Sequence, residues 1–164
     1  MYMTIYSPII LDIESSGFGS HSYPIEVGVI LEDKTKYCSL IKPESNWVHW
    51  SEEAEKIHHI KRDSLINNGK SPYDVANHLN KLLKGKIVYS DGWVVDSTWL
   101  IRLFEAAQLE MTFSLSAIEM ILKEQQMRRW DDMKNVVIRE LKLDRHRASN
   151  DAQIIQETFT RTLN

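Results

Sequence analysis

Residues 8–18 read PIILDIESSGF, an apolar and β-branched run that ends in acids, two serines and a glycine. Such a run predicts a short buried strand that leads into a turn. Asp12 and Glu14 stand two positions apart in it, so in a strand both side chains point to the same face. Two adjacent carboxylates repel each other unless a cation lies between them, and hard divalent ions favour oxygen ligands. In a chain with 23 acidic residues this pair is a weak signal by itself, and its alternative is a solvated strand end.

The segments that follow predict further strands and then mainly helices. Residues 25–32 and 36–41 are separated by a short polar turn, so they should form a hairpin beside the first strand, and residues 86–90 form another strand. Helical spacing and capping residues predict helices that begin at Ser51 and near Asp63, and helices that cover 71–85, 94–107, 115–125, 129–141 and 148–162. The order, without a repeat or a linker, indicates one α/β domain over residues 1–164 with a mixed sheet.

The composition is that of a soluble globular protein. The 164 residues are 43% hydrophobic and 26% charged, enough for a core without disulfides. No apolar stretch has the length of a membrane span and no basic leader precedes the first strand, so we expect a cytoplasmic protein with no membrane partner. Cys38 is the only cysteine, which excludes an internal disulfide and a cysteine-rich zinc site. We expect it to pack on a strand.

The net charge of −3 limits the kind of nucleic-acid partner. A protein that grips long duplex DNA through its phosphates has a strongly basic surface, which this chain lacks. The charge leaves room for an enzyme that holds a few terminal nucleotides, because metal ions on a carboxylate cluster supply positive charge that a residue count misses.

Two further groups carry candidate chemistry. Asp91 and Asp96 follow the strand at 86–90, and Asp96 falls at the start of a helix, where an acid is also favourable for structural reasons. His146 stands five residues before Asp151 in a polar segment that leads into the last helix. Its alternative is an ordinary surface pair.

The order of these pieces resembles that of a known family. The chain has Asp12 and Glu14 followed by SSGF, then PIEVGV at 24–29, IHHI at 57–60, Asp96, and HRASND at 146–151. It is similar over nearly its whole length to the DnaQ-like (DEDDh) 3′-5′ exonucleases of the ribonuclease H-like superfamily. These carry D-x-E and two hydroxyl residues, I-E-x-G-x-V, I-H-G-I, an Asp that opens a central helix, and H-x4-D. The resemblance implies a ribonuclease H-like single domain, with a mixed five-stranded sheet flanked by helices.

The resemblance also implies a site and a reaction. Asp12, Glu14, Asp96 and Asp151 would hold two Mg²⁺ or Mn²⁺ ions roughly 3.5–4 Å apart, and His146, in the loop before the last helix, would take a proton from the attacking water. The products would be nucleoside 5′-monophosphates, released from single-stranded or short 3′ ends. The small size and acidic balance favour RNA slightly over DNA, and family habit suggests a homodimer.

Five residues are candidates for contacting the substrate: Ser15, Gly17, Phe18, His58 and Trp93. Phe18 is suited to stacking on the terminal base, with a partly buried loop anchor as the alternative. His58 has a helix-end role as its alternative, and Trp93 is the tryptophan least expected to fill the core.

The chain departs from the family at two positions. Gly92 replaces an Asn that often stands four residues before the central Asp, and His59 replaces the Gly of I-H-G-I. Neither change removes a ligand or the base, so both bear on substrate preference. We expect Glu26, inside the second strand motif, to be structural. The main alternative to an exonuclease is a catalytically inactive module of the same fold that binds nucleic acid or a partner, and a second is an endonuclease of the wider superfamily.

Overall fold

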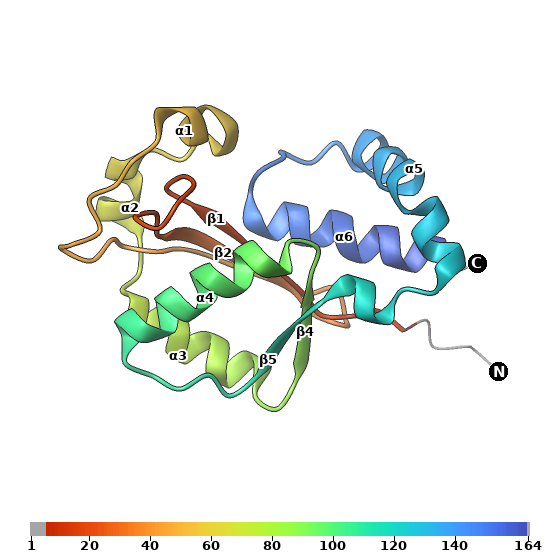
Figure 1. Ribbon diagram of the computed structural model, residues 1–164, viewed down its shortest axis with the longest axis horizontal. Helices are drawn as coiled ribbons and strands as arrows, with labels where there is room; N and C mark the ends of the chain where they lie inside the picture. Colours follow the sequence, from red (N-terminus) through yellow and green to blue (C-terminus); the bar gives the residue numbers. More distant parts are fainter. Residues whose placement is uncertain (1–5, 164) are drawn as a thin grey trace.

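Five strands form one mixed sheet in the order β3-β2-β1-β4-β5 (Figure 1). The structure is a computed structural model and describes residues 6–163. Antiparallel pairing joins β1 (Ile10–Ser15), β2 (Pro24–Ile30) and β3 (Lys36–Leu40), whereas β4 (Ile87–Ser90) and β5 (Ser114–Ala117) continue the sheet in parallel. This confirms the predicted α/β fold class and the hairpin beside the first strand.

Within residues 6–163, six α-helices accompany the sheet. The helices of the described residues are α1 (Glu52–His58), α2 (Arg62–Asn68), α3 (Pro72–Leu83), α4 (Trp93–Ala107), α5 (Glu124–Leu141) and α6 (Ala148–Thr162). In Figure 1, α3 and α4 lie on one side of the sheet, and α6, covered by α5, lies on the other. None of the helices in residues 6–163 is long and apolar enough to cross a membrane.

The alternation of side chains along β1 explains why the carboxylates meet α6. Leu11 and Ile13 belong to the larger core between the sheet and α3 and α4, whereas Ile10 packs with Ala152 and Ile155 of α6. Side chains two apart share a face of a strand, so Asp12 and Glu14 continue the row that Ile10 begins. The first strand is therefore apolar on both faces at its start and acidic on the α6 face at its end.

Helices α1 and α6 begin where the sequence predicted. The Ser51 side chain accepts a hydrogen bond from the backbone N of Ala54 and caps α1, and α6 runs from Ala148 to Thr162. An N-cap hydroxyl satisfies one of the backbone donors that a helix leaves free at its start.

The prediction of a helix over 115–125 is wrong. Residues 114–117 form β5 against β4, and a single 3-10 turn (Ile118–Ile121) follows. Leu115, Ile118 and Leu122 have helical spacing, but pairing with a strand distant in sequence outweighs that local pattern. Helix α5 also begins at Glu124, earlier than the predicted 129.

Cys38 lies on a strand as expected, but its side chain is exposed, which contradicts the expected packing. The reason is that β3 is the outer strand of the sheet.

Candidate active site

Four acids predicted as metal ligands converge from three elements. Asp12 and Glu14 lie on β1, Asp96 in the first turn of α4, and Asp151 in the first turn of α6. Strand β4 runs parallel to β1, so it delivers the start of α4 to the edge where β1 ends. The carboxylates of Glu14, Asp96 and Asp151 all act electrostatically on Asp12. The sequence order therefore becomes a spatial cluster.

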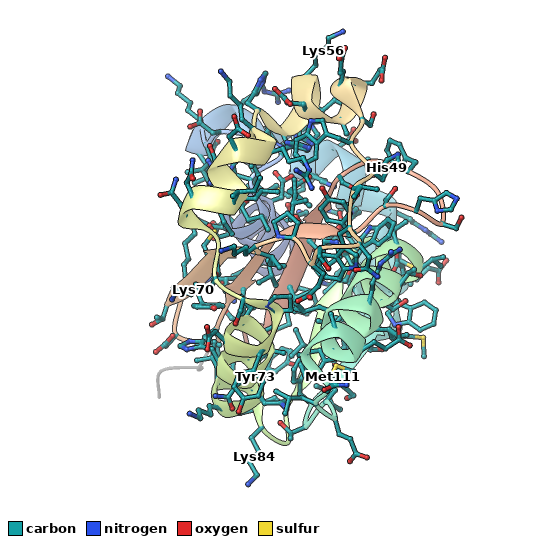
Figure 2. The ribbon with its side chains drawn as sticks, turned by 90° about the vertical axis from the view of Figure 1, so that its left-hand side faces the viewer. His49, Lys56, Lys70, Tyr73, Lys84 and Met111 are labelled. Atoms are coloured by element: carbon teal, nitrogen blue, oxygen red, sulfur yellow. The ribbon has the colours of Figure 1, made fainter. Side chains whose placement is uncertain are left out.

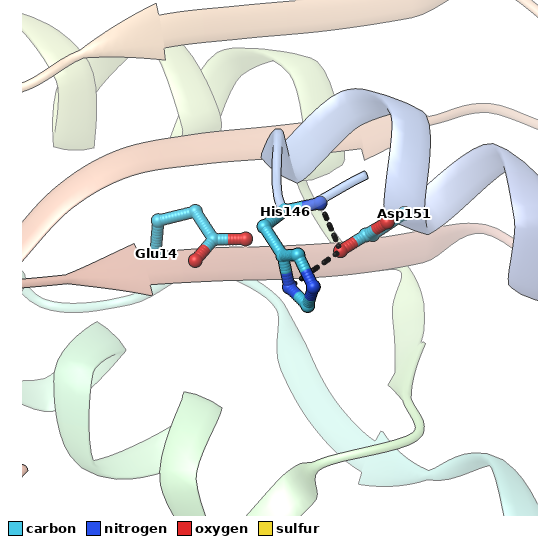
Figure 3. Close-up of side chains that lie close together, drawn as sticks. All are labelled: Glu14, His146 and Asp151. Carbon is cyan, nitrogen blue, oxygen red and sulfur yellow. Dashed lines mark hydrogen bonds and ion pairs between the residues drawn. The ribbon is translucent and has the colours of Figure 1, made fainter. Parts of the chain in front are cut away.

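His146 joins this cluster from the loop before α6 (Figure 3). Ligand atoms of Glu14, His146 and Asp151 lie within 4.8 Å of one another. The backbone N of His146 donates to Asp151 Oδ2 at 3.1 Å, and its Nδ1 lies 3.9 Å from the same oxygen. His146 has a φ of 59°, so the chain turns sharply there before it enters α6. The position of His146 in the loop, and not on the helix, confirms that prediction.

Burial and mutual repulsion raise the pKa values of the clustered acids. Burial, followed by the charges of Asp96, Glu14 and Asp151, raises the pKa of Asp12 well above its ordinary range. Burial, and then Asp151 and Glu26, raise the pKa of Glu14 to about 8. A cation between these groups would relieve both the desolvation and the repulsion.

The pKa of Asp96 is raised to about 7, chiefly by burial. The Ser90 hydroxyl opposes this shift by donating to Asp96 Oδ2 at 2.5 Å, and Asp91 adds repulsion. Ser90 therefore orients Asp96, a contact that the sequence analysis missed because no local pattern links a strand-end serine to a helix acid six residues later.

Asp12 supplies the observation that fits a metal ion. Its Oδ2 is buried and has no hydrogen-bond partner among residues 6–163. Buried acceptors in proteins are nearly always satisfied, and an unpaired carboxylate oxygen beside three other carboxylates suits a hard divalent cation. The donor set of Asp12, Glu14, Asp96 and Asp151 therefore fits the expected Mg²⁺ or Mn²⁺.

Two cations of the chain itself border the cluster. Arg145 Nε donates to Asp151 Oδ1 at 3.0 Å, and Lys134 Nζ lies 2.9 Å from Asp91 Oδ2. Together with Asp12 these residues line a cavity of about 50 Å³. Lys134 gave no signal in the sequence, because a lysine on an amphipathic helix is ordinarily solvated.

The turn after β1 is held tightly beneath Phe18. Ser15 Oγ donates to Gly17 O at 2.8 Å, and a Cβ on Gly17 would lie 2.8 Å from atoms of both His49 and Ser51. Ser15 and Gly17 thus shape the turn, whereas Phe18 is 81% exposed. A partly buried loop anchor does not describe Phe18.

A cavity of about 870 Å³ opens beside Phe18. Its walls come from the turn after β1, loop 43–50 and α4, and include Phe18, Trp47, Val95, Ile101 and Arg102. Figure 2 views the molecule from the end at which this loop lies, with His49 near the top. Arg102 donates to the carbonyls of Ser20 and Ser22 at 2.8 and 2.6 Å, and it lies over the Trp47 ring. These contacts join the turn after β1 and Trp47 to α4, so the three segments that line the cavity hold one another in place.

Trp93 and His58 have different surroundings. Trp93 is 44% exposed at the start of α4, and its Nε1 donates to Leu115 O at 3.1 Å. His58 is only 3% exposed, and its Nδ1 accepts from the backbone N of Ile60. His58 therefore has the helix-end role that was its alternative, and His59 caps the same helix with a φ of 58°. The predicted contact of His58 with the substrate gains no support from this geometry.

Comparison with solved structures gives the same fold. Escherichia coli exonuclease I in complex with a dA16 oligonucleotide is 13% identical, with a TM-score of 0.68 over 96% of this chain. A zinc-bound complex of the same enzyme with single-stranded DNA gives 0.66, also at 13% identity and 96% coverage. Exonuclease I from Methylocaldum szegediense is 15% identical, with a TM-score of 0.55 over 76% of this chain.

This likeness establishes the fold. The chain spans 41% of the length of the two Escherichia coli structures and 30% of the Methylocaldum one. No protein-family model and no curated protein matches the sequence.

Proposed function

We propose that the chain is a metal-dependent 3′-5′ exonuclease that releases nucleoside 5′-monophosphates from single-stranded ends. The observation that carries the proposal is the convergence of Asp12, Glu14, Asp96 and Asp151 with His146, around a buried Asp12 oxygen that has no partner among the described residues. The structural neighbours support it, because their oligonucleotide complexes are those of an exonuclease.

The carboxylates have one task in this mechanism, to hold two Mg²⁺ or Mn²⁺ ions. When bound, such ions activate water and stabilise charge on a phosphodiester. Asp12 and Glu14 are fixed on a strand, and Asp96 is held by Ser90. These groups therefore need to move little when the charge on the scissile phosphate changes.

His146 would accept the proton of the attacking water. Its side chain is partly exposed, so water reaches it, and its ring lies beside Glu14 and Asp151. Imidazole changes charge near neutral pH, which suits a general base. The exposed position of the ring allows the proton to pass on to solvent after each cut.

The cavity beside Phe18 favours unpaired nucleotides. Phe18, Val95 and Ile101 give it exposed apolar walls, and Val95 adjoins Asp96 in α4. Bases in a duplex have their edges paired and their faces stacked, so only a single strand offers bases to such walls. Glu44 and Glu105 also line the cavity and disfavour phosphates there.

Single-stranded ends of both DNA and RNA are candidate substrates. The small size and acidic balance favoured RNA slightly, whereas the oligonucleotides in the neighbouring structures are DNA. The expected homodimer stays a prediction.

Digestion of 5′-labelled single-stranded DNA and RNA, resolved on a gel, tests the proposal. With Mn²⁺ or Mg²⁺ we expect a ladder that shortens from the 3′ end, and its loss with EDTA or in Asp12→Asn. The exposed acid Asp131, changed to Asn, is the matched control and should cut normally. Internal fragments would indicate an endonuclease, and intact strands that are still bound would indicate a binding module.

A further inference from the structure

Glu26 is a fully buried acid that the proposed chemistry does not use. Its exposure is 0%, although it lies inside β2 among apolar residues. A carboxylate removed from water is costly unless hydrogen bonds and an opposite charge compensate it. Glu26 therefore needs partners, and they come from a part of the chain more than a hundred residues later.

Those partners are the first residues of α6 and the residue before it. Arg147 donates from Nη2 to Glu26 Oε2 at 2.6 Å and from Nε to the same oxygen at 3.1 Å. The backbone N of Ala148 donates to Glu26 Oε1 at 2.7 Å. Arg147 Nε also donates to Oε1 at 3.2 Å, so the guanidinium contacts both carboxylate oxygens and the start of the helix contacts one of them.

This contact replaces an ordinary helix cap. Arg147 holds the N-cap position of α6 and makes no capping hydrogen bond with its own side chain. The Glu26 carboxylate supplies the missing acceptor from another element, at the helix end where the dipole favours negative charge. The start of α6 is therefore fastened to β2.

Gly28 brings the helix close enough for this. A Cβ at Gly28 would lie 2.1 Å from the backbone N of Ser149 and 2.3 Å from the carbonyl carbon of Ala148. The helix start rests directly on the strand, two residues beyond Glu26 on the same face. The I-E-V-G pattern in β2 thus has a physical role in docking the last helix.

His146 directly precedes Arg147 and Ala148, the two residues that contact Glu26. Its φ of 59° is uncommon for a residue with a side chain, and its backbone N is held by Asp151 on one side while Arg147 is held by Glu26 on the other. Among the described residues, its ring makes one charged contact, the 3.9 Å approach of Nδ1 to Asp151 Oδ2. The backbone of the loop therefore sets the position from which the ring reaches the cluster.

We propose that Glu26 and Arg147 are positioning residues that hold His146 at the carboxylate cluster. The proposal rests on the proposed function, because it takes His146 as the base. Loss of the pair lets the loop move, and the base then spends less time in line with the water. A displacement of about 1 Å can lower a rate by roughly 100-fold. The rate of cleavage should fall without an equal loss of substrate binding.

The test uses Arg147→Gln beside the double variant Glu26→Gln/Arg147→Gln, which leaves no buried charge without its partner. Thermal melts of both variants check that each is folded before its rate is compared. The matched control is Arg161→Gln, because Arg161 lies on the same helix and also pairs with acids, Glu140 and Glu157, but lies at the far end. We expect kcat to fall roughly 10- to 100-fold in Arg147→Gln, with KM and calorimetric Mn²⁺ affinity changed less than about 3-fold. Arg147→Lys, which keeps the charge but not the fork, should recover part of the rate.

A double-mutant cycle separates positioning from a general structural effect. If Arg147 acts through His146, then adding Arg147→Gln to a His146→Gln variant should leave the residual rate unchanged. The proposal would be overturned if Arg147→Gln lowered the rate by the same factor with and without His146, or if kcat in Arg147→Gln were unchanged. Cleavage by the wild-type protein would still support the proposed function in either case. A wild-type protein that cuts no strand under any metal would overturn both.

Discussion

Arg145 donates from Nε to Asp151 Oδ1 at 3.0 Å, so one of the clustered carboxylates is already paired with a cation of the chain itself. The other oxygen of Asp151 accepts from the backbone N of His146. Both oxygens of a proposed metal ligand are therefore engaged in the metal-free protein. A metal ion that binds Asp151 has to share it with Arg145 or displace it.

We predict that Arg145→Gln tightens metal binding. Removal of the competing guanidinium frees Asp151 Oδ1, and a partly exposed ion pair contributes about 0.2–1 kcal/mol, so the Mn²⁺ dissociation constant should fall roughly 1.4- to 5-fold. Isothermal titration calorimetry measures this directly. Arg128→Gln is the control, because Arg128 pairs with Glu124 on the exposed face of α5. Weaker Mn²⁺ binding in Arg145→Gln would mean that Arg145 orients Asp151 for the ion.

The metal-free protein should lose stability as the pH rises. The pKa of Glu14 is raised to about 8 and that of Asp96 to about 7, both chiefly by burial, whereas unfolded carboxyls titrate near pH 4. A raised folded pKa means that the folded state binds more protons across that window, so this stability is full below about pH 4 and is lost progressively as the pH rises to the folded pKa values of about 7 and 8. Thermal melts in EDTA should show a lower Tm at pH 8.5 than at pH 6, by roughly 5 °C.

Mg²⁺ should reverse this dependence, because ion binding requires the deprotonated carboxylates. The rise in Tm on adding Mg²⁺ should therefore be larger at pH 8.5 than at pH 6. Glu14→Gln should flatten the metal-free profile, since it removes one of the titrating groups. A metal-free Tm that is equal at the two pH values would show that ionisation of the clustered carboxyls does not destabilise the folded protein.

Local patterns predicted the parts of this fold that depend on neighbours in sequence. The strand that carries Asp12 and the start of α6 at Ala148 follow from apolar runs and helix boundaries, and the structure has both. Strand β5 was missed because a four-residue strand is defined by its partner β4, which no local pattern reveals.

The candidate site divides in the same way. The resemblance named the four acids and His146, and the structure brings them together, while their roles stay predictions. The contacts that hold them were not predictable, because Glu26 and Arg147 are 121 residues apart and Ser90 and Asp96 meet only through the turn between β4 and α4. The resemblance gives the candidate site residues, whereas long-range packing gives the groups that contact them.

Phe18→Ala should weaken the binding of single strands. Stacking of a base on an aromatic ring contributes about 1–3 kcal/mol, so KM for an oligonucleotide should rise roughly 5- to 100-fold. The Tm should stay unchanged, because the side chain is 81% exposed. Val48→Ala, on the neighbouring loop and 74% exposed but outside the cavity lining, is the matched control. Steady-state kinetics on single-stranded DNA measure both, and an unchanged KM in Phe18→Ala would remove Phe18 from the substrate site.

Gly28→Ala should be among the most destabilising single-methyl changes in the chain. Its Cβ would lie 2.1 Å from the backbone N of Ser149, so the start of α6 has to move away from β2, at a cost of about 1–3 kcal/mol or more. Gly92→Ala is the control, because a Cβ there would lie 3.7 Å from Asp96 Oδ2, which is an ordinary van der Waals distance. Urea unfolding of both variants measures their free energies of unfolding.

The same shift of α6 breaks the hydrogen bond from Ala148 N to Glu26, so Gly28→Ala should also lower kcat in the manner of Arg147→Gln. A Gly28→Ala protein as stable and as active as wild type would show that the strand and the helix start have room between them.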